Sequence, residues 1–152
     1  AAMQLETMAR ASLTPGWKDM VVAQMDQADR YLVQENERRW EINSTKFVKQ
    51  FLNDISAGID RSTIALQFHF WLISCISRLV EKLSSTTGIR DVVLSGGCLQ
   101  NGILLEGLIY CLTRLELRPH SPVAIPVNDG GVSVGQALIG GLHHVSRSAD
   151  ES

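Results

Sequence analysis

The amino-acid sequence predicts an α/β protein that is rich in helix and has a small sheet. The main observation is a pair of consecutive units, each made of a short apolar run, a glycine turn and a helix-like segment. The first unit joins a strand at residues 92–94 to a helix at 102–115, and the second joins a strand at 123–125 to a helix at 132–143. Two such crossover units in succession are typical of an open α/β sheet.

Two amphipathic helices precede these units. Asn43 or Ser44 is a suitable N-cap for the first helix, and Asp60 or Ser62 for the second, which stops before Gly88. In both segments apolar residues recur at spacings of three and four, as expected for one buried helix face. These residues are Phe47, Phe51, Leu52 and Ile55 in the first helix and Ile64, Phe68, Trp71, Leu72, Cys75, Leu79 and Leu83 in the second.

The first 42 residues carry a weaker pattern. Residues 1–9 are strong helix formers with no capping residue ahead of them, which favours a fragment of a larger protein. Pro15 and Gly16 then break the chain, and residues 17–39 are mixed and polar, with helix expected in part of them. A short strand or hairpin is expected at 31–33 or 39–42. At the other end, residues 146–152 are small and polar, and we expect a flexible tail after a domain at 1–145.

Composition excludes several classes of function. With 152 residues and 45% hydrophobic content, the chain is about one domain with enough apolar side chains for a core. The 14 Lys and Arg face 16 Asp and Glu without a basic cluster, so we expect no nucleic-acid surface. Three cysteines without paired spacing argue against a disulfide framework and favour a reducing cytoplasm. Polar residues interrupt the apolar runs well short of the roughly 20 residues needed to span a bilayer, so we expect no membrane segment.

Polar groups at the strand ends suggest a nucleotide site. Gly96 and Gly97 follow the first strand, where they either form a simple tight turn or let a phosphate approach the main chain. Asn101 either caps the following helix or directs its amide toward a sugar or phosphate. Asp129 lies in a glycine-flanked turn and either caps the next helix or binds a metal. Because open α/β sheets bind ligands at strand carboxyl ends, and helix N-termini favour anions, we interpret residues 91–136 as one wall of a nucleotide site.

Five other residues that often carry chemistry are given structural interpretations. His69 lies between two phenylalanines inside a helix, without a second metal ligand one turn away, so we expect a packed histidine. His120 lies beside prolines in an expected loop, and the histidines at 143–144 near a helix end, and neither position indicates a function. Cys98 follows the glycine pair but has no base partner in the sequence, so we assign it no catalytic role.

These motifs closely resemble a known family. Residues 93–101 (VLSGGCLQN), followed by Leu104, Leu105 and Glu106, and residues 125–136 (IPVNDGGVSVGQ) resemble the C-terminal part of the HypF family. These proteins are the carbamoyltransferases of [NiFe]-hydrogenase maturation. Residues 64–69 (IALQFH) and 1–6 (AAMQLE) are also similar to that family. The resemblance covers most of residues 1–145 and thins between about 15 and 42.

The resemblance implies a fold and an activity. The fold is the actin-like, sugar-kinase ATPase fold, in which nucleotide lies between two lobes built on RNase H-like sheets; this chain resembles most of the C-terminal lobe. Similar modules occur in the universal tRNA threonylcarbamoyladenosine synthesis protein and in O-carbamoyltransferases. The implied reaction converts carbamoyl phosphate and ATP into carbamoyl adenylate. The carbamoyl group then passes to the C-terminal cysteine of a partner, HypE, for synthesis of the iron cyanide ligands.

The resemblance also implies roles for four nucleotide-binding residues. Gly96 and Gly97 match glycines whose main chain faces the nucleotide phosphate, and Asn101 matches an asparagine that contacts the adenylate. Glu6 matches an acidic residue near the ribose. The sequence departs from the family pattern at Cys98, commonly a valine, and at Gly102, commonly an arginine, which bears on any charge contact made just after Asn101.

For metal binding, the resemblance assigns Asp129 to a site for a divalent cation, which is iron, zinc or magnesium. Its other ligands in the family are two histidines four residues apart on the other lobe, and no such pair occurs here. We therefore expect the isolated chain to be metal-free, inactive in carbamoyl transfer, and prone to self-association through the surface that the other lobe covers. Two alternatives stay open: a kinase lobe of the same fold, for which the sequence offers no phosphoryl-transfer base, and a docking module without catalysis.

Overall fold

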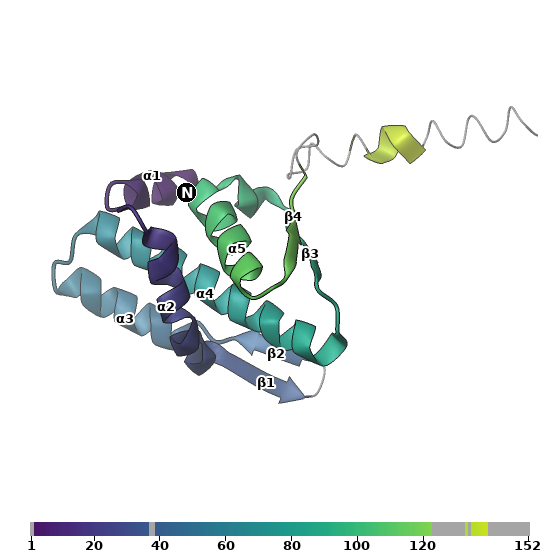
Figure 1. Ribbon diagram of the computed structural model, residues 1–152. Coiled ribbons are helices and arrows are strands. Elements are labelled where there is room, and N and C mark those ends of the chain that lie inside the picture. Colours follow the sequence, from purple (N-terminus) through teal and green to yellow (C-terminus); the bar gives the residue numbers. More distant parts are fainter. Residues whose placement is uncertain (1, 37–38, 123–132, 134, 140–152) are drawn as a thin grey trace, which may run out of the picture.

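The computed structural model describes residues 2–36, 39–122, 133 and 135–139. Helices dominate this part of the chain, and its four strands are short (Figure 1). In chain order the elements are α1 (Ala2–Arg10), α2 (Trp17–Ala28), the 3-10 turn η1 (Asp29–Tyr31), β1 (Leu32–Asn36), β2 (Arg39–Ile42), α3 (Thr45–Ser56), α4 (Arg61–Thr87), β3 (Asp91–Val93), the 3-10 turn η2 (Gly97–Gln100), α5 (Gly102–Arg114) and β4 (Arg118–His120).

Helix α4 is the element on which the others pack. It begins at the predicted cap, where the Asp60 carboxylate accepts the N–H groups of Ser62 and Thr63 at 3.0 and 3.3 Å. It ends at Gly88, whose φ of +74° closes the helix. In Figure 1, α4 runs through the middle of the molecule, with α1 and α5 above it and α3 and the β1–β2 hairpin below.

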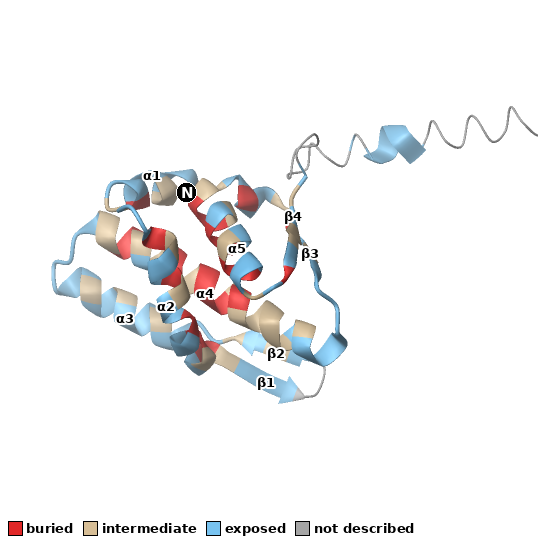
Figure 2. Ribbon diagram, viewed as in Figure 1, coloured by how far each residue is buried: buried red, intermediate tan, exposed pale blue. Residues whose placement is uncertain are grey.

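The main core lies where α4, α5 and α2 meet. Figure 2 shows the buried residues of these helices facing one another. Ile73 of α4 and Leu112 of α5 are fully buried, and Trp17 of α2 stacks on Phe70 with ring centroids 6.0 Å apart. Gly107 lets α5 approach α4 closely, because a Cβ there would lie 2.5 Å from Cδ1 of Ile73. The two helices are therefore held at a distance that suits glycine alone.

Helix α4 is long and apolar enough, by length and composition, to cross a membrane. The sequence analysis expected no segment that is long and apolar enough to span a bilayer, and by length and composition α4 is such a segment. Half of its most apolar window is buried inside the protein, against α1, α2 and α5. The same composition is expected of a core helix that packs against neighbours on several sides, as α4 does.

Helix α3 has the predicted start but leaves its apolar face exposed. The Asn43 side-chain oxygen accepts the N–H of Thr45 at 3.0 Å. Phe47 stacks on Trp71 of α4 with centroids 4.3 Å apart, yet no residue of α3 is buried. The apolar face of α3, defined here as Val48, Leu52 and Ile55, is 47–56% exposed.

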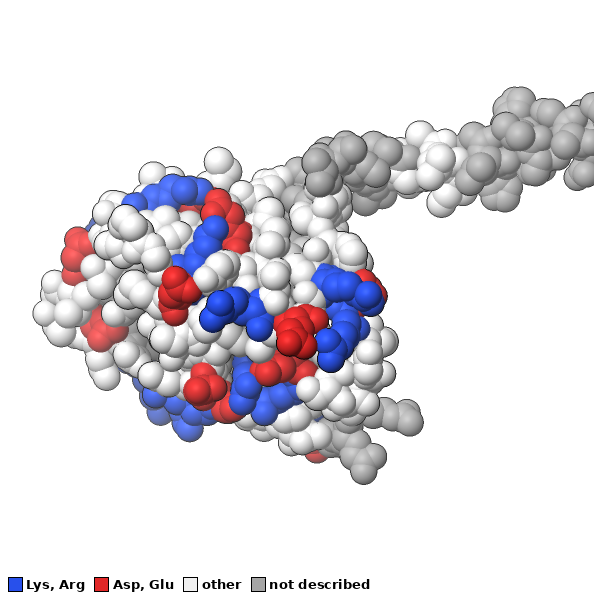
Figure 3. Space-filling view, viewed as in Figure 1, with Lys and Arg blue, Asp and Glu red and all other residues white. Residues whose placement is uncertain are grey.

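The first small sheet is a hairpin, which is one of the alternatives expected for residues 31–33 and 39–42. Strands β1 and β2 pair antiparallel, with Leu32 opposite Ile42 and an irregularity between Gln34 and Asn36. An ion-pair cluster joins the η1 turn above it to α4, because Asp29 binds Arg78 at 2.9 Å and Lys82 at 3.1 Å. Figure 3 shows basic and acidic side chains interspersed over this face of the molecule.

The second small sheet corrects the sequence analysis. Strand β3 pairs in parallel with β4, with Val93 opposite His120, so His120 lies in a strand and not in a loop. Proline is unfavourable in a strand, but here the N–H of Arg118 donates to the Arg90 carbonyl at 2.8 Å and the His120 carbonyl accepts the N–H of Leu94 at 2.7 Å, at the two ends of β3. The missing N–H of Pro119 therefore faces the outer edge. The Asp91 carboxylate binds His120 and Arg118 at 2.8 and 2.5 Å, and these bonds lower the pKa of Asp91.

The first predicted strand–turn–helix unit is confirmed as β3, η2 and α5, with the strand one residue earlier than expected. Of the second unit, the predicted strand at 123–125 lies outside the described residues, as does Asp129. Residues 133 and 135–139 are helical, within the predicted helix at 132–143. The predicted tail at 146–152 also lies outside the described residues.

Candidate functional site

The turn after β3 presents an open main chain. Gly96 has φ +117° and ψ 157°, a conformation that glycine adopts without strain, and no atom lies within 4 Å of a Cβ built at Gly96 or Gly97. Leu99 anchors the turn from below: its side chain is 8% exposed and its N–H donates to the Gly96 carbonyl at 3.0 Å. Within the described part of the chain, no hydrogen bond engages the N–H groups of Gly97 and Cys98. The turn therefore offers two adjacent backbone donors to a ligand.

Asn101 caps α5, which is one of its two interpretations from the sequence. Its backbone is extended, with φ −73° and ψ 110°, and its Oδ1 accepts the N–H of Leu104 at 3.0 Å. Its Nδ2 lies 2.7 Å from Nε2 of His69 on α4. A primary amide has two N–H groups, so one N–H of Asn101 remains for another partner.

His69 is the packed histidine that the sequence predicts, and it also contacts the site. Its side chain is 1% exposed, and its Nδ1 lies 2.7 Å from the carbonyl oxygen of Ala65, one turn earlier on α4. Its other ring nitrogen meets Asn101. No sequence spacing signals this contact, because the two residues are 32 positions apart and meet only through the packing of α4 on α5.

Glu6 reaches the same place from α1. Its Oε1 accepts the N–H of Gly102 at 3.0 Å and binds Nη2 of Arg10 at 2.7 Å. The Glu6 side chain is only 15% exposed, and a carboxylate is favourable at the start of a helix. Together with Asn101, Glu6 already occupies N–H groups of the first turn of α5. An incoming anion is therefore expected at the preceding glycine turn and not on α5 itself.

Gly102 makes room for Arg10. A Cβ at Gly102 would lie 2.7 Å from Nη2 of Arg10 and 3.3 Å from Oε1 of Glu6. A guanidinium group therefore lies beside residue 102, carried by Arg10 of α1 and oriented by Glu6. A positive charge therefore lies beside position 102 although residue 102 itself is a glycine.

The structure brings together the four predicted nucleotide-binding residues that it describes. Gly96, Gly97 and Asn101 lie in one continuous turn, and Glu6 joins them across 96 positions of sequence. The fifth predicted site residue, Asp129, lies outside the described residues, so the prediction that it lies beside Gly97 stays a prediction. Within the described ranges, no group of three or more His, Cys, Asp or Glu side chains could hold a metal ion.

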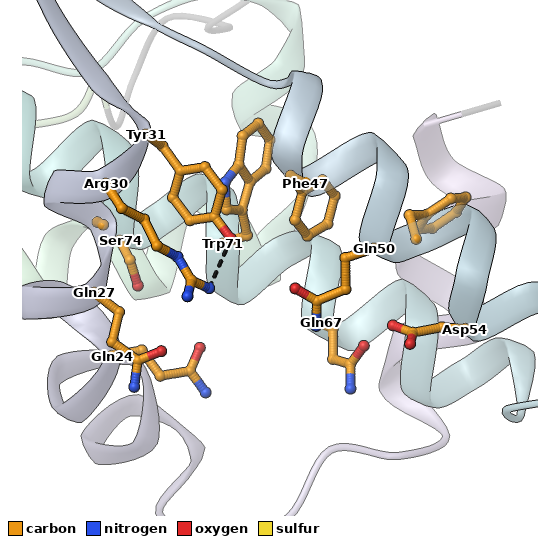
Figure 4. Close-up of a pocket in the computed structure, with 12 residues that line it drawn as sticks. Gln24, Gln27, Arg30, Tyr31, Phe47, Gln50, Asp54, Gln67, Trp71 and Ser74 are labelled. Atoms are coloured by element: carbon orange, nitrogen blue, oxygen red, sulfur yellow. Dashed lines mark hydrogen bonds between the residues drawn. The ribbon is translucent and has the colours of Figure 1, made fainter.

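A separate cavity of about 220 Å³ lies between α2, α3 and α4 (Figure 4). Its lining includes four glutamines, at 24, 27, 50 and 67, together with Arg30, Tyr31 and Trp71. Figure 4 shows the Arg30 guanidinium bonded to the Tyr31 hydroxyl, at 2.7 Å. None of the four described site residues, which are Glu6, Gly96, Gly97 and Asn101, lines this cavity. It is therefore distinct from the glycine turn.

Comparison with known proteins shows what the chain is similar to. Residues 1–136 match the family described as "Carbamoyltransferase, Kae1-like Domain, second subdomain". The carbamoyltransferase HypF of Rhizobium leguminosarum bv. viciae is 38% identical over 69 residues, which are 45% of this chain and 9% of that protein. HypF2 of Cupriavidus necator is 31% identical over 102 residues, which are 66% of this chain and 13% of that protein.

A solved structure agrees with these matches. It is a full-length HypF in the phosphate- and nucleotide-bound form, 35% identical, with a TM-score of 0.65 over 72% of this chain and 14% of that chain. The matches place the chain in the carbamoyltransferase class. Within that class it belongs to the HypF family, of which it represents the C-terminal part. The chain spans about a tenth of the length of the curated relatives it matches.

Proposed function

We propose that this chain is the nucleotide-binding C-terminal lobe, of the actin-like ATPase fold, in a hydrogenase maturation carbamoyltransferase that acts in the cytoplasm. The observation that carries the proposal is the open glycine turn with two adjacent unpaired N–H groups. Such donors suit a phosphate, and they belong to a chain of the HypF family. The description of the solved relative as phosphate- and nucleotide-bound supports the same ligand class.

In the proposed reaction of the whole protein, carbamoyl phosphate is hydrolysed to carbamate and phosphate. A carbamate oxygen then attacks the α-phosphorus of ATP, so that pyrophosphate leaves and carbamoyl adenylate forms. The thiolate of the C-terminal cysteine of a HypE-like partner then attacks the carbamoyl carbon. The bond between that carbon and the adenylate oxygen breaks, AMP leaves, and the carbamoyl group remains on the partner's sulfur. The contribution of this chain is to bind and orient the nucleotide.

The roles that we propose for individual residues are those implied by the resemblance to the HypF family. The main chain at Gly96 and Gly97 binds the phosphate, the free N–H of Asn101 contacts the adenylate, and Glu6 lies near the ribose. Asp129 contributes one carboxylate to a divalent metal, which is iron, zinc or magnesium. Because a single carboxylate binds such a cation weakly, the isolated chain is expected to be metal-free and inactive in carbamoyl transfer. Elemental analysis that finds one bound metal per isolated chain would contradict this.

The sharpest test is Gly97→Ala in the full-length protein. The new Cβ meets no atom within 4 Å, and Gly97 does not have a positive φ, so the fold is expected to be unchanged. A methyl group there intrudes on a phosphate that approaches the turn, and we expect nucleotide affinity measured by calorimetry to fall several-fold. The matched control is Gln100→Ala, an exposed neighbour in the same turn, which should bind normally. Normal binding by Gly97→Ala would place the nucleotide elsewhere.

The second candidate is a docking module without catalysis, favoured by the exposed apolar face of α3. The two functions differ in what Asn101→Ala and Asp129→Ala do in the full-length protein. A nucleotide-binding lobe loses adenylate affinity in both variants, whereas a docking module keeps it. Leu52→Asp on the apolar face of α3 separates the two functions in the other direction. If this face is a docking surface, the variant loses partner binding but keeps its nucleotide affinity.

A further inference from the structure

The contact between His69 and Asn101 fixes the direction of every hydrogen bond around the amide. The N–H of Leu104 can only donate, so the atom of Asn101 that faces it is the oxygen. The amide nitrogen of Asn101 therefore faces His69, whose Nε2 must accept. The ring proton then lies on Nδ1, where it donates to the Ala65 carbonyl. Each atom has one role that satisfies all its partners.

The alternative orientation of the amide is excluded by the same contacts. Rotating the Asn101 amide by half a turn would place its NH₂ group against the Leu104 N–H, and two donors would face each other. Both would lose their partners, at a site where the neighbouring His69 is 1% exposed and little water can replace them. The ring of Phe68 stands perpendicular to His69 at a centroid distance of 6.0 Å and restricts the histidine in turn.

We propose that His69 is a positioning residue of the nucleotide site. By holding one N–H of the Asn101 amide, it directs the other N–H toward an acceptor oxygen of the nucleotide, on its sugar or its phosphate. This inference rests on the proposed function of Asn101, and adds a residue that does not touch the ligand. His69 acts only through Asn101. Once Asn101 is replaced, replacing His69 as well should therefore have no further effect on nucleotide affinity.

A matched pair of substitutions separates positioning from packing. In His69→Asn, the shorter amide can replace Nδ1 and donate to the Ala65 carbonyl but cannot reach Asn101. In His69→Gln, the longer amide replaces Nε2 and can accept from Asn101 but leaves the Ala65 carbonyl unpaired. Both variants put a neutral amide in place of a buried imidazole. They differ in whether Asn101 keeps its partner.

The measurement is calorimetric affinity of full-length protein for ADP, with thermal stability recorded in parallel. We expect His69→Asn to weaken ADP binding about tenfold, and His69→Gln to retain most of the affinity. In an Asn101→Ala background, His69→Asn should have no further effect on affinity. Equal affinities for the two His69 variants, or a loss that simply adds to that of Asn101→Ala, would overturn the inference.

Failure of this inference is distinguishable from failure of the proposed function. If Gly97→Ala and Asn101→Ala both bind ADP normally, the nucleotide does not lie at this turn and the proposed function is wrong. If they weaken binding while His69→Asn and His69→Gln do not differ, the site is correct and His69 has a packing role only. Should His69→Asn fail to fold, His69→Leu takes its place, because leucine offers no acceptor to Asn101; ADP binding by His69→Leu that is as tight as that of His69→Gln would then overturn the inference.

Discussion

Replacing Gly107 with alanine tests the packing that brings α5 against α4. A Cβ at this position would lie 2.5 Å from Cδ1 of Ile73 and 3.2 Å from both Cγ1 of Ile73 and Cζ3 of Trp17. Ile73 is fully buried and Trp17 is 8% exposed, so neither side chain has open space to enter. The new methyl group must therefore push α5 away from α4.

Two opposing effects set the magnitude. Alanine is better than glycine in a helix interior by about 1 kcal/mol, whereas inserting a methyl group into a packed core costs about 1–3 kcal/mol. Because 2.5 Å is far inside normal contact, we expect a cost at the upper end of that range. The net loss in the free energy of unfolding should be about 2 kcal/mol. The same displacement should lengthen the bond between His69 and Asn101, which lies on the same pair of helices.

The assay is urea unfolding followed by tryptophan fluorescence, with Ile73→Val as the matched background. Valine lacks the Cδ1 atom that the new methyl group meets, and Ile73→Val itself costs about 1 kcal/mol. In that background we expect the penalty of Gly107→Ala to shrink by at least about 1 kcal/mol. A penalty that is the same in both backgrounds, or absent in the parent, would refute the packing argument.

Three further predictions concern charge, thiols and association. A hydrogen bond from Arg78 is the main cause that lowers the pKa of Asp29 below its ordinary value of 3.8. The ionised Asp29 carboxylate therefore stabilises the fold at pH values above 3.8, and this stabilisation is lost as the pH falls below 3.8. Because Asp29 is 39% exposed the effect is small, and acid titration of Asp29→Asn should show a weaker loss of stability than the parent. Burial raises the pKa of Cys75 to about 12 and of Cys111 to about 11, so at pH 8 a thiol reagent should label only Cys98 in the native chain and all three cysteines in denaturant. Light scattering of the isolated chain at high concentration should show association through the apolar face of α3, and a charged residue on that face should leave a monomer; a monomer in the parent would remove this idea.

The sequence by itself determined the elements whose signals are local. Asp60 and Gly88 mark the ends of α4 because a helix cap depends on a few adjacent residues. The glycine turn and the helix after Asn101 were predicted for the same reason, and the β1–β2 hairpin was one of two alternatives for its segment. The helix-rich α/β class follows from these elements. The family resemblance, carried by two short motifs, was likewise readable from the sequence and is confirmed.

Only the tertiary structure decided how these elements meet. The pairing of β4 with β3 was missed because Pro119 is unfavourable in a strand, and only the geometry of the ladder shows that its missing N–H faces outward. The contacts of Glu6 with Gly102 and of His69 with Asn101 join residues 96 and 32 positions apart. Such contacts depend on the crossing of packed helices, which is set by shape and volume over the whole core. Local sequence patterns do not determine how helices cross. The sequence therefore predicted the individual site residues but not the contacts between them.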